Sequence, residues 1–83
     1  MEVIITPEAL AQYAALPKAI QRRVRTITTR LRNWPQISGA KALRGQRAGH
    51  FRIRTGDYRV PFHVAGETIV VAKIGHRDGF YED

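Results

Sequence analysis

The residues best suited to chemistry in this chain are the arginines and histidines of one short stretch, His50 to Val64. The stretch reads His-Phe-Arg-Ile-Arg-Thr-Gly-Asp-Tyr-Arg-Val-Pro-Phe-His-Val. Its guanidinium groups are planar forks that suit phosphate, and histidine is the side chain that exchanges protons near neutral pH. This combination favours an anionic partner, with phosphate as the group that fits it.

The stretch predicts a β-hairpin, because two alternating runs flank Gly56-Asp57. Glycine at the first position of a two-residue loop is typical of a type II′ turn, whose twist suits the flanking strands. With that turn, Thr55 pairs with Tyr58 and the register of the other pairs follows. Those pairs are Arg54 with Arg59, Ile53 with Val60, Arg52 with Pro61, Phe51 with Phe62, and His50 with His63.

This register sorts the hairpin into an apolar side and a basic side, because side chains alternate between the faces of a strand. The apolar side carries Phe51, Ile53, Tyr58, Val60 and Phe62. The basic side carries His50, Arg52, Arg54, Arg59 and His63. Opposed like charges such as Arg54 and Arg59 cost roughly 0.2–1 kcal/mol. Because these five residues include no carboxylate, the counter-charge comes from elsewhere in the fold or from a ligand.

Length and composition predict one small, basic domain over residues 1–83. The net charge is +7, with eleven arginines and three lysines. Twelve basic residues and one acidic residue lie between Lys18 and Arg59, a balance typical of nucleic-acid-binding proteins. The absence of cysteine excludes disulfides and cysteine-based sites. No run reaches membrane-spanning length and no signal peptide is recognisable, so we expect a cytoplasmic protein without a membrane partner.

The first third of the chain predicts a strand followed by two helices. Glu2 to Thr6 is short and β-branched, which favours a strand. Thr6 suits a helix N-cap and Pro7 the first helical position. We expect the first helix to bury Leu10, Tyr13 and Ala14, and the second to begin at Leu16-Pro17.

The second helix has a clear amphipathic pattern. Its apolar stripe is Ile20, Val24, Ile27, Leu31 and Trp34. Most of its arginines lie off that stripe: Arg22, Arg23, Arg25, Arg30 and Arg32. The helix is expected to end at Asn33-Trp34-Pro35, because a residue before proline disfavours helical backbone.

The rest of the chain predicts a loop and a final strand. Gln36 to Gly49 is expected to be a loop, and the last strand to run from about Thr68 to Gly75. Pro61 cannot donate to a ladder, so we expect a bulge or a broken ladder beside it. The predicted fold is α+β, with an N-terminal strand, a helix hairpin and a three-stranded antiparallel meander. The helices pack on one face of a mainly antiparallel sheet.

The ordered set of motifs resembles the RelE/ParE superfamily of bacterial type II toxins. The residues that carry the resemblance are Leu16-Pro17, Lys41-Ala42-Leu43-Arg44-Gly45, Phe51-Arg52-Ile53-Arg54, Gly56-Asp57-Tyr58-Arg59-Val60, Gly75-His76-Arg77 and Tyr81. The match covers nearly the whole chain, and the series is more similar to the RelE branch than to the gyrase-poisoning ParE branch.

The resemblance implies a toxin that cleaves mRNA in the ribosomal A site by attack of the 2′-OH on the adjacent phosphate, without metal or other cofactor. Its partners would be the ribosome, mRNA and a cognate antitoxin that covers the basic face. Carried over by position, Arg52 and Arg54 match the basic pair of the family, and Arg59 matches the arginine that stabilises the phosphate. Arg77 matches the arginine near the leaving group, and Tyr81 the tyrosine that stacks on the codon.

One departure from the family concerns proton transfer. The best-known members carry lysines at the two positions of the basic pair, and arginine is a poor general base near neutral pH. We therefore take His76, beside the leaving-group arginine, as the candidate for proton exchange. His50, His63, Arg44 and Arg47 are expected to contact RNA.

Three other interpretations compete with this one. His50 and His63 are expected about 5 Å apart at Cβ and could share a metal ion, but arginines nearby repel a cation. A ParE-like inhibitor of DNA gyrase is a second alternative. A non-catalytic nucleic-acid-binding module, or a decayed toxin, is the third.

Overall fold

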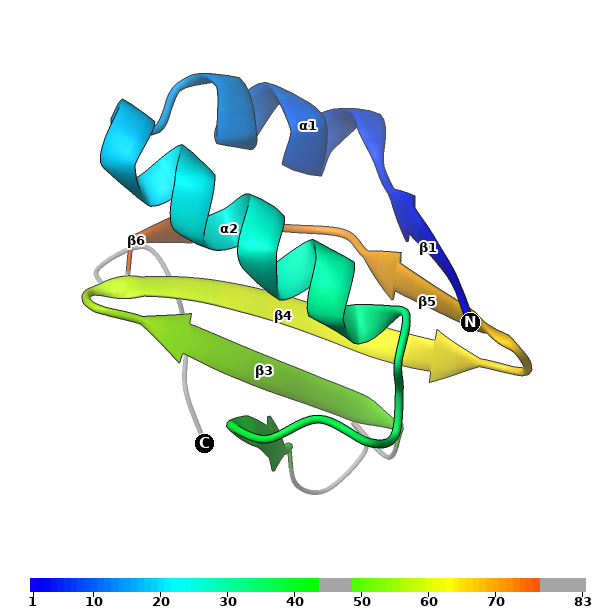
Figure 1. Ribbon diagram of the computed structural model, residues 1–83. Coiled ribbons are helices and arrows are strands. Elements are labelled where there is room, and N and C mark those ends of the chain that lie inside the picture. Colours follow the sequence, from blue (N-terminus) through cyan, green and yellow to red (C-terminus); the bar gives the residue numbers. More distant parts are fainter. Residues whose placement is uncertain (44–48, 77–83) are drawn as a thin grey trace.

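The chain folds into one mixed β-sheet with two helices, as the computed structural model shows for residues 1–43 and 49–76 (Figure 1). The elements are β1 (Glu2–Ile5), α1 (Pro7–Ala14), α2 (Lys18–Leu31), β2 (Ala40–Ala42), β3 (His50–Thr55), β4 (Tyr58–Ala65), β5 (Thr68–Val71) and β6 (Gly75–His76). The strand order is β1-β5-β4-β3-β2, and β6 also pairs with β4. β1 is parallel to β5, while the other ladders are antiparallel. The predicted α+β fold is confirmed.

α1 begins as the sequence predicts but buries a different side. The Thr6 side chain accepts a hydrogen bond of 3.2 Å from the backbone N–H of Ala9, and Pro7 occupies the first turn. Ala9 is fully buried, whereas Leu10 is 56% exposed. The predicted burial of Leu10 and Ala14 is therefore wrong. α1 is short and lies toward the β1 side of the sheet (Figure 1), so few of its positions face the core.

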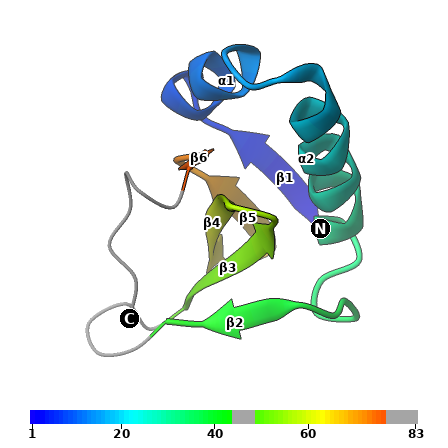
Figure 2. The same cartoon turned by 90° about the vertical axis from the view of Figure 1, so that its left-hand side faces the viewer.

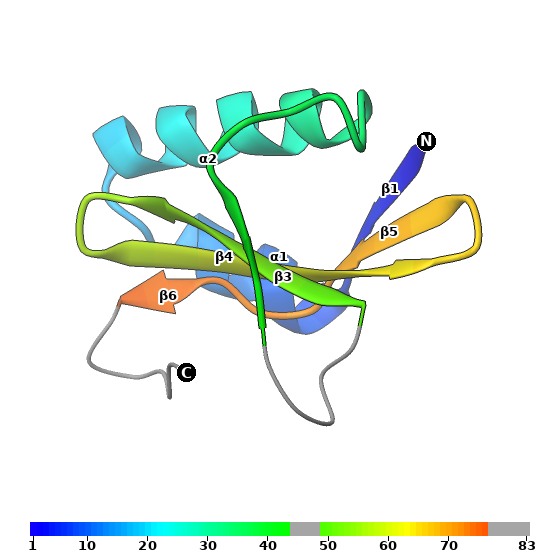
Figure 3. The same cartoon turned by 90° about the horizontal axis from the view of Figure 1, so that it is seen from below.

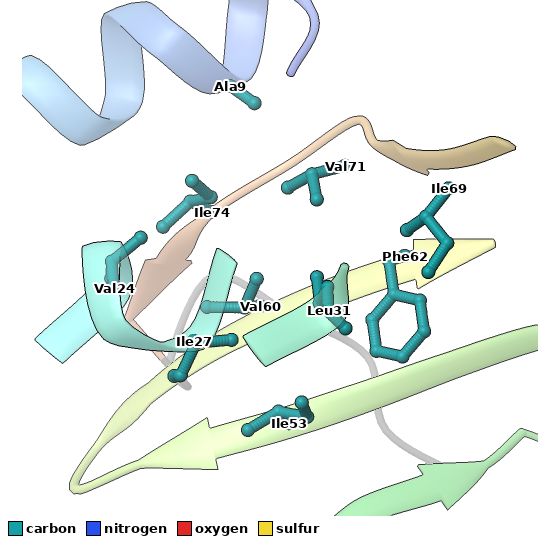
Figure 4. Close-up of a cluster of buried hydrophobic side chains, with 10 residues drawn as sticks. All are labelled: Ala9, Val24, Ile27, Leu31, Ile53, Val60, Phe62, Ile69, Val71 and Ile74. Atoms are coloured by element: carbon teal, nitrogen blue, oxygen red, sulfur yellow. The ribbon is translucent and has the colours of Figure 1, made fainter. Parts of the chain in front are cut away.

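α2 packs its predicted stripe onto the apolar side of the hairpin. Figure 4 shows Val24, Ile27 and Leu31 of this helix facing a layer of strand residues, and all are buried. The strand residues of that core are Ile53, Val60, Phe62, Ile69 and Val71, with Ile74 beyond them. Figure 2 shows α2 on one side of the β3–β4 hairpin. Among the described residues, no helix is long and apolar enough to cross a membrane.

The hairpin register agrees with the prediction at every pair. β3 and β4 align His50 with His63 at one end and Thr55 with Tyr58 beside the turn. Gly56 has a φ of +60°, a conformation that glycine adopts without the steric cost of a Cβ atom. The register matters for function because it decides which side chains share the basic side.

The region predicted as a loop contains a strand. Residues Ala40–Ala42 form β2 and pair with β3 (Figure 3). The backbone N–H of Leu43 continues this pairing by donating to the His50 carbonyl at 2.9 Å. An outer strand with unpaired backbone groups favours such pairing, and three residues are too few for a sequence pattern to show it. The prediction of a loop from Gln36 to Gly49 is wrong at these positions.

The ladder beside Pro61 is broken, as predicted. β4 pairs with β5 through residues 63–65 and with β6 through residues 58–59, so residues 60–62 are skipped. The expected last strand is therefore two strands separated by residues 72–74. α1 holds this interruption, since Gln12 Oε1 accepts a 2.7 Å hydrogen bond from the Ile74 N–H. The Thr6 hydroxyl donates to the Ala72 carbonyl at 3.2 Å.

Candidate nucleic-acid interface

Two arginines lie buried on the side of the β3–β4 hairpin opposite α2. Arg52 is 6% exposed and Arg59 is 5% exposed. Burial of a guanidinium group costs desolvation free energy that an apolar side chain would not incur. Arg59 Nη1 donates to the Tyr58 carbonyl at 3.5 Å. Both side chains are nearly excluded from solvent.

Arg54 completes the predicted arginine row but has a different environment. It is opposite Arg59 in the register, yet it is exposed. It also lines a depression of about 250 Å³ between α2 and β3, together with Arg23 and Arg30. The three predicted arginines thus divide into a buried pair and one exposed neighbour.

Lys41 joins this face through β2. It is opposite Arg52 in the β2–β3 register, and side chains of directly opposed residues share a face of the sheet. Lys41 is exposed and places an amine beside the arginine row. Lys41 was not among the predicted site residues, although Arg44 and Arg47 of the same predicted loop were. The alternation of Ala40, Lys41 and Ala42 was the only local signal.

The two histidine rings of the basic side contact one another across the strands in a tilted arrangement. The ring centroids of His50 and His63 are 4.9 Å apart and the ring planes differ by 30°. They border a pocket of about 290 Å³ at the broken ladder, with Pro61 and Lys73 among the other lining residues. The broken ladder exposes this space, and Lys73 is a second basic residue that the sequence analysis did not assign to the site.

The described residues provide no complete metal site. No group of three or more histidine, cysteine or carboxylate side chains converges among them. His50 and His63 remain a pair of nitrogen ligands, with a lysine ammonium at the same pocket. A structural zinc site uses four protein ligands and a catalytic one three, so this pair alone does not fit a resident metal ion.

His76 lies on the other side of the sheet from the buried arginines. It pairs with Tyr58 in the β4–β6 ladder, and the two rings make an edge contact with centroids 5.3 Å apart. Tyr58 is two residues from the core residue Val60, so it shares the helix-covered side. His76 Nε2 is 3.9 Å from Asp57 Oδ2. The structure therefore does not bring His76 together with Arg52 and Arg59, because strand pairing selects the opposite face.

Arg44, Arg47, Arg77 and Tyr81 lie outside the described residues. The described part of the predicted site therefore consists of the arginine row, the pair His50 and His63, and the separate His76.

Comparison with known proteins identifies a toxin family. A sequence model of the ParE toxin of the type II toxin–antitoxin system parDE matches residues 3–79. The curated protein Toxin RelE3 of Methanocaldococcus jannaschii is 26% identical over 86 residues, covering 99% of this chain and 97% of the relative.

Solved structures agree with this assignment. The chain resembles one in the toxin–antitoxin complex RelBE2 of Mycobacterium tuberculosis, with a TM-score of 0.75, 30% identity and coverage of 92% of this chain and 96% of the other. It also shares its fold with a chain of the RelB–RelE complex from Methanococcus jannaschii, with a TM-score of 0.78, 22% identity and 92% coverage of both chains. The chain belongs to the ParE toxin family and is a type II toxin of the RelE/ParE superfamily.

Proposed function

We propose that this toxin cleaves mRNA on the ribosome, and that the face of the β3–β4 hairpin opposite α2 carries the reaction. The observation that carries the proposal is the presence of two buried guanidinium groups, Arg52 and Arg59, beside the exposed Arg54. Buried positive charge in a preorganised setting stabilises charge that develops on a reacting phosphate. The similarity to RelE toxins supports this assignment.

In the proposed reaction the 2′-oxygen of a ribose bonds to the adjacent phosphorus while the bond from phosphorus to the 5′-oxygen breaks. The products are a cyclic phosphate and a free 5′-OH. Negative charge builds on the non-bridging oxygens, and Arg59 with Arg52 would stabilise it. Exposed Arg54 would bind the substrate strand before the reaction, and Arg77 and Tyr81 would act at the leaving group and the codon.

The proton transfers need a group other than the arginines. A guanidinium remains protonated in proteins and so cannot accept the proton of the 2′-OH. Lys41 lies on the same face and carries an amine, which can exchange a proton and serves as a general base in other enzymes. We therefore assign Lys41, rather than His76, as the first candidate for proton transfer among the described residues.

The proposed partners are the ribosome, mRNA and a cognate antitoxin, and the compartment is the cytoplasm, where ribosomes act. The similar chains from Mycobacterium tuberculosis and Methanococcus jannaschii come from toxin–antitoxin complexes. An antitoxin that covers the basic side of the hairpin would exclude RNA from it. His50 and His63, with Arg44 and Arg47, are the proposed additional RNA contacts.

A ribosome-programmed cleavage assay tests this function. Purified toxin is mixed with ribosomes carrying a 5′-labelled mRNA, and the 3′ ends of the fragments are mapped. Cleavage in the A-site codon that requires the ribosome is expected, and the Arg59→Ala variant should have greatly reduced activity. Intact mRNA after prolonged incubation with the folded toxin would contradict the proposal.

A second candidate function is inhibition of DNA gyrase, because the matching sequence model describes the ParE toxin of parDE. A supercoiling assay with purified gyrase separates the two functions. Loss of supercoiling together with intact ribosome-bound mRNA would favour the gyrase function.

A further inference from the structure

The pocket at the break in the β4 ladder is kept open from both of its sides. On β4, Pro61 has no backbone N–H with which to pair. On the other side the chain bends between β5 and β6 (Figure 1), and α1 with its N-cap holds that bend. The Thr6 hydroxyl donates to the Ala72 carbonyl at 3.2 Å, and the Ile74 N–H donates to Gln12 Oε1 at 2.7 Å. Because two independent elements prevent the strands from closing, the space is a built feature of the fold.

This space, which we call the ladder-gap pocket, combines an apolar lining with basic side chains. The apolar lining comes from Pro61, Phe62, Val70 and Ala72, and the basic side chains are His50, His63 and Lys73. Within the described part of the chain, no acidic residue lines it. Its volume of about 290 Å³ is close to the lower limit of small-ligand sites, about 300 Å³. The pocket therefore suits one flat, mainly apolar group that belongs to a negatively charged molecule.

The ladder-gap pocket adjoins the arginine row on the same face of the hairpin. His50 is two residues from Arg52 on β3, so both side chains are on the face opposite α2. His63 is directly opposite His50, and Val70 is directly opposite His63, which adds both to this face. Two residues of a strand span about 6.6 Å, a distance that one nucleotide of an extended strand can cover. A strand with a phosphate at Arg52 can therefore place a neighbouring base at the pocket.

We propose that the ladder-gap pocket receives one unpaired base of the RNA strand whose phosphate binds at the arginine row. This inference rests on the proposed function and deepens it, since it assigns a base subsite to the same face. Unpaired bases stack on aromatic side chains, histidine among them, and the rings of His50 and His63 border the pocket. Pro61 and Val70 provide apolar contacts for the base, and the Lys73 ammonium can donate to the phosphate of the same nucleotide.

The setting of the pocket favours a base over a side chain of a protein partner. A protein helix that docks in a groove inserts several apolar anchors along one face. Here the neighbouring side chains on β2 and β3 are Lys41 and Arg52, which attract a phosphate backbone. The Pro61 carbonyl points toward the gap, because the pair with Arg52 is not hydrogen-bonded. It can accept a hydrogen bond from an N–H of a base, whereas an apolar side chain has nothing to donate.

NMR of the histidine rings in the full-length toxin tests the inference without relying on cleavage. The ligand is a short single-stranded RNA with 2′-O-methyl groups, whose 2′-oxygens cannot attack. A matched oligonucleotide keeps every phosphate but lacks the bases. A base that stacks on an imidazole shifts the resonances of that ring. His76 is the internal control, because it lies beside Tyr58 on the other face.

The complete oligonucleotide is expected to shift the resonances of His50 and His63 and to leave those of His76 in place. The abasic oligonucleotide should give much smaller shifts and bind roughly tenfold more weakly, since stacking contributes to affinity. Equal shifts with both oligonucleotides, or unshifted His50 and His63 resonances with the complete one, would overturn the inference. So would saturation by a nucleoside monophosphate at a lower concentration than by the RNA, because the ligand would then be a free nucleotide.

A variant that fills the pocket tests the location of the base. Ala72 is exposed and lines the pocket, so Ala72→Leu occupies the space without entering the core. Ala11→Leu on α1 is the matched control, because Ala11 is also exposed and lies outside the pocket. Ala72→Leu should weaken binding of the complete oligonucleotide by roughly tenfold, and Ala11→Leu should leave it unchanged. Equal affinities of the two variants, with thermal unfolding showing both folded, would contradict the assignment.

Cleavage on programmed ribosomes is measured separately and distinguishes this inference from the proposed function. Base-dependent shifts of His50 and His63 without any cleavage would support the base subsite and contradict the proposed function. Cleavage combined with equal shifts from the complete and abasic oligonucleotides would do the opposite.

Discussion

Arg52 lies opposite Pro61 in the β3–β4 ladder, and at the same point β4 loses its pairing with the last two strands. In this register the pair is not hydrogen-bonded, so the N–H that proline lacks would point toward β5 and β6. A buried arginine and a gap in the ladder therefore meet at one position. The pocket that His50 and His63 border lies at this gap in the ladder.

Replacing Pro61 by alanine is expected to destabilise the toxin by roughly 0.5–1 kcal/mol. The proline restricts the unfolded chain, and alanine would add an N–H facing the interrupted part of the ladder. Urea unfolding of both proteins measures the difference in the free energy of unfolding. An increase in stability would mean that the new N–H recruits residues 72–74 into the ladder.

Leu31→Ala should be severely destabilising, because the Leu31 side chain, on the sheet-facing side of α2, is fully buried. Truncation of a buried leucine costs about 2–5 kcal/mol, a large part of the stability of a small domain. Chemical denaturation followed by circular dichroism should show a lower midpoint. Arg32→Ala, one residue further along, is the control and should change the stability by less than about 0.5 kcal/mol.

Arg59→Ala should lower the rate constant of cleavage on programmed ribosomes by on the order of 10²–10³. The reason is that a preorganised donor acts on charge that develops in the transition state, so ribosome binding should be largely retained. Single-turnover cleavage at saturating ribosome concentration measures the rate constant. A variant that binds more weakly but cleaves normally once bound would place Arg59 in binding only.

Lys41 and His76 can be compared as proton carriers. Lys41→Ala and Lys41→Arg should both slow cleavage by about 10²-fold or more, because arginine restores the charge but not the proton exchange. His76→Ala should leave the rate nearly unchanged, since His76 lies with Tyr58 on the other face. Single-turnover rates across pH are the measurement. Full activity of Lys41→Arg would limit Lys41 to an electrostatic role.

The hairpin register, the α2 stripe and the ladder break could be predicted from the sequence, because each depends on local periodicity or on one residue's chemistry. The turn at Gly56-Asp57 sets the register, and a shift of one residue would reverse every side chain. Pro61 has no backbone N–H to donate to a neighbouring strand, whatever packs around it. The order of the motifs also indicates the RelE/ParE superfamily, to which the chain belongs.

Other features depend on contacts between distant segments, and only the tertiary structure decided them. β2 exists because it pairs with β3, which brings Lys41 beside Arg52. His76 faces Tyr58 because the interrupted last strand re-enters the ladder at that register. The exposure of Leu10 follows from the position of α1 toward the sheet edge. The burial of a side chain, and the face of the sheet on which a short strand presents it, depend on the segments that pack against it. No local sequence pattern encodes those contacts.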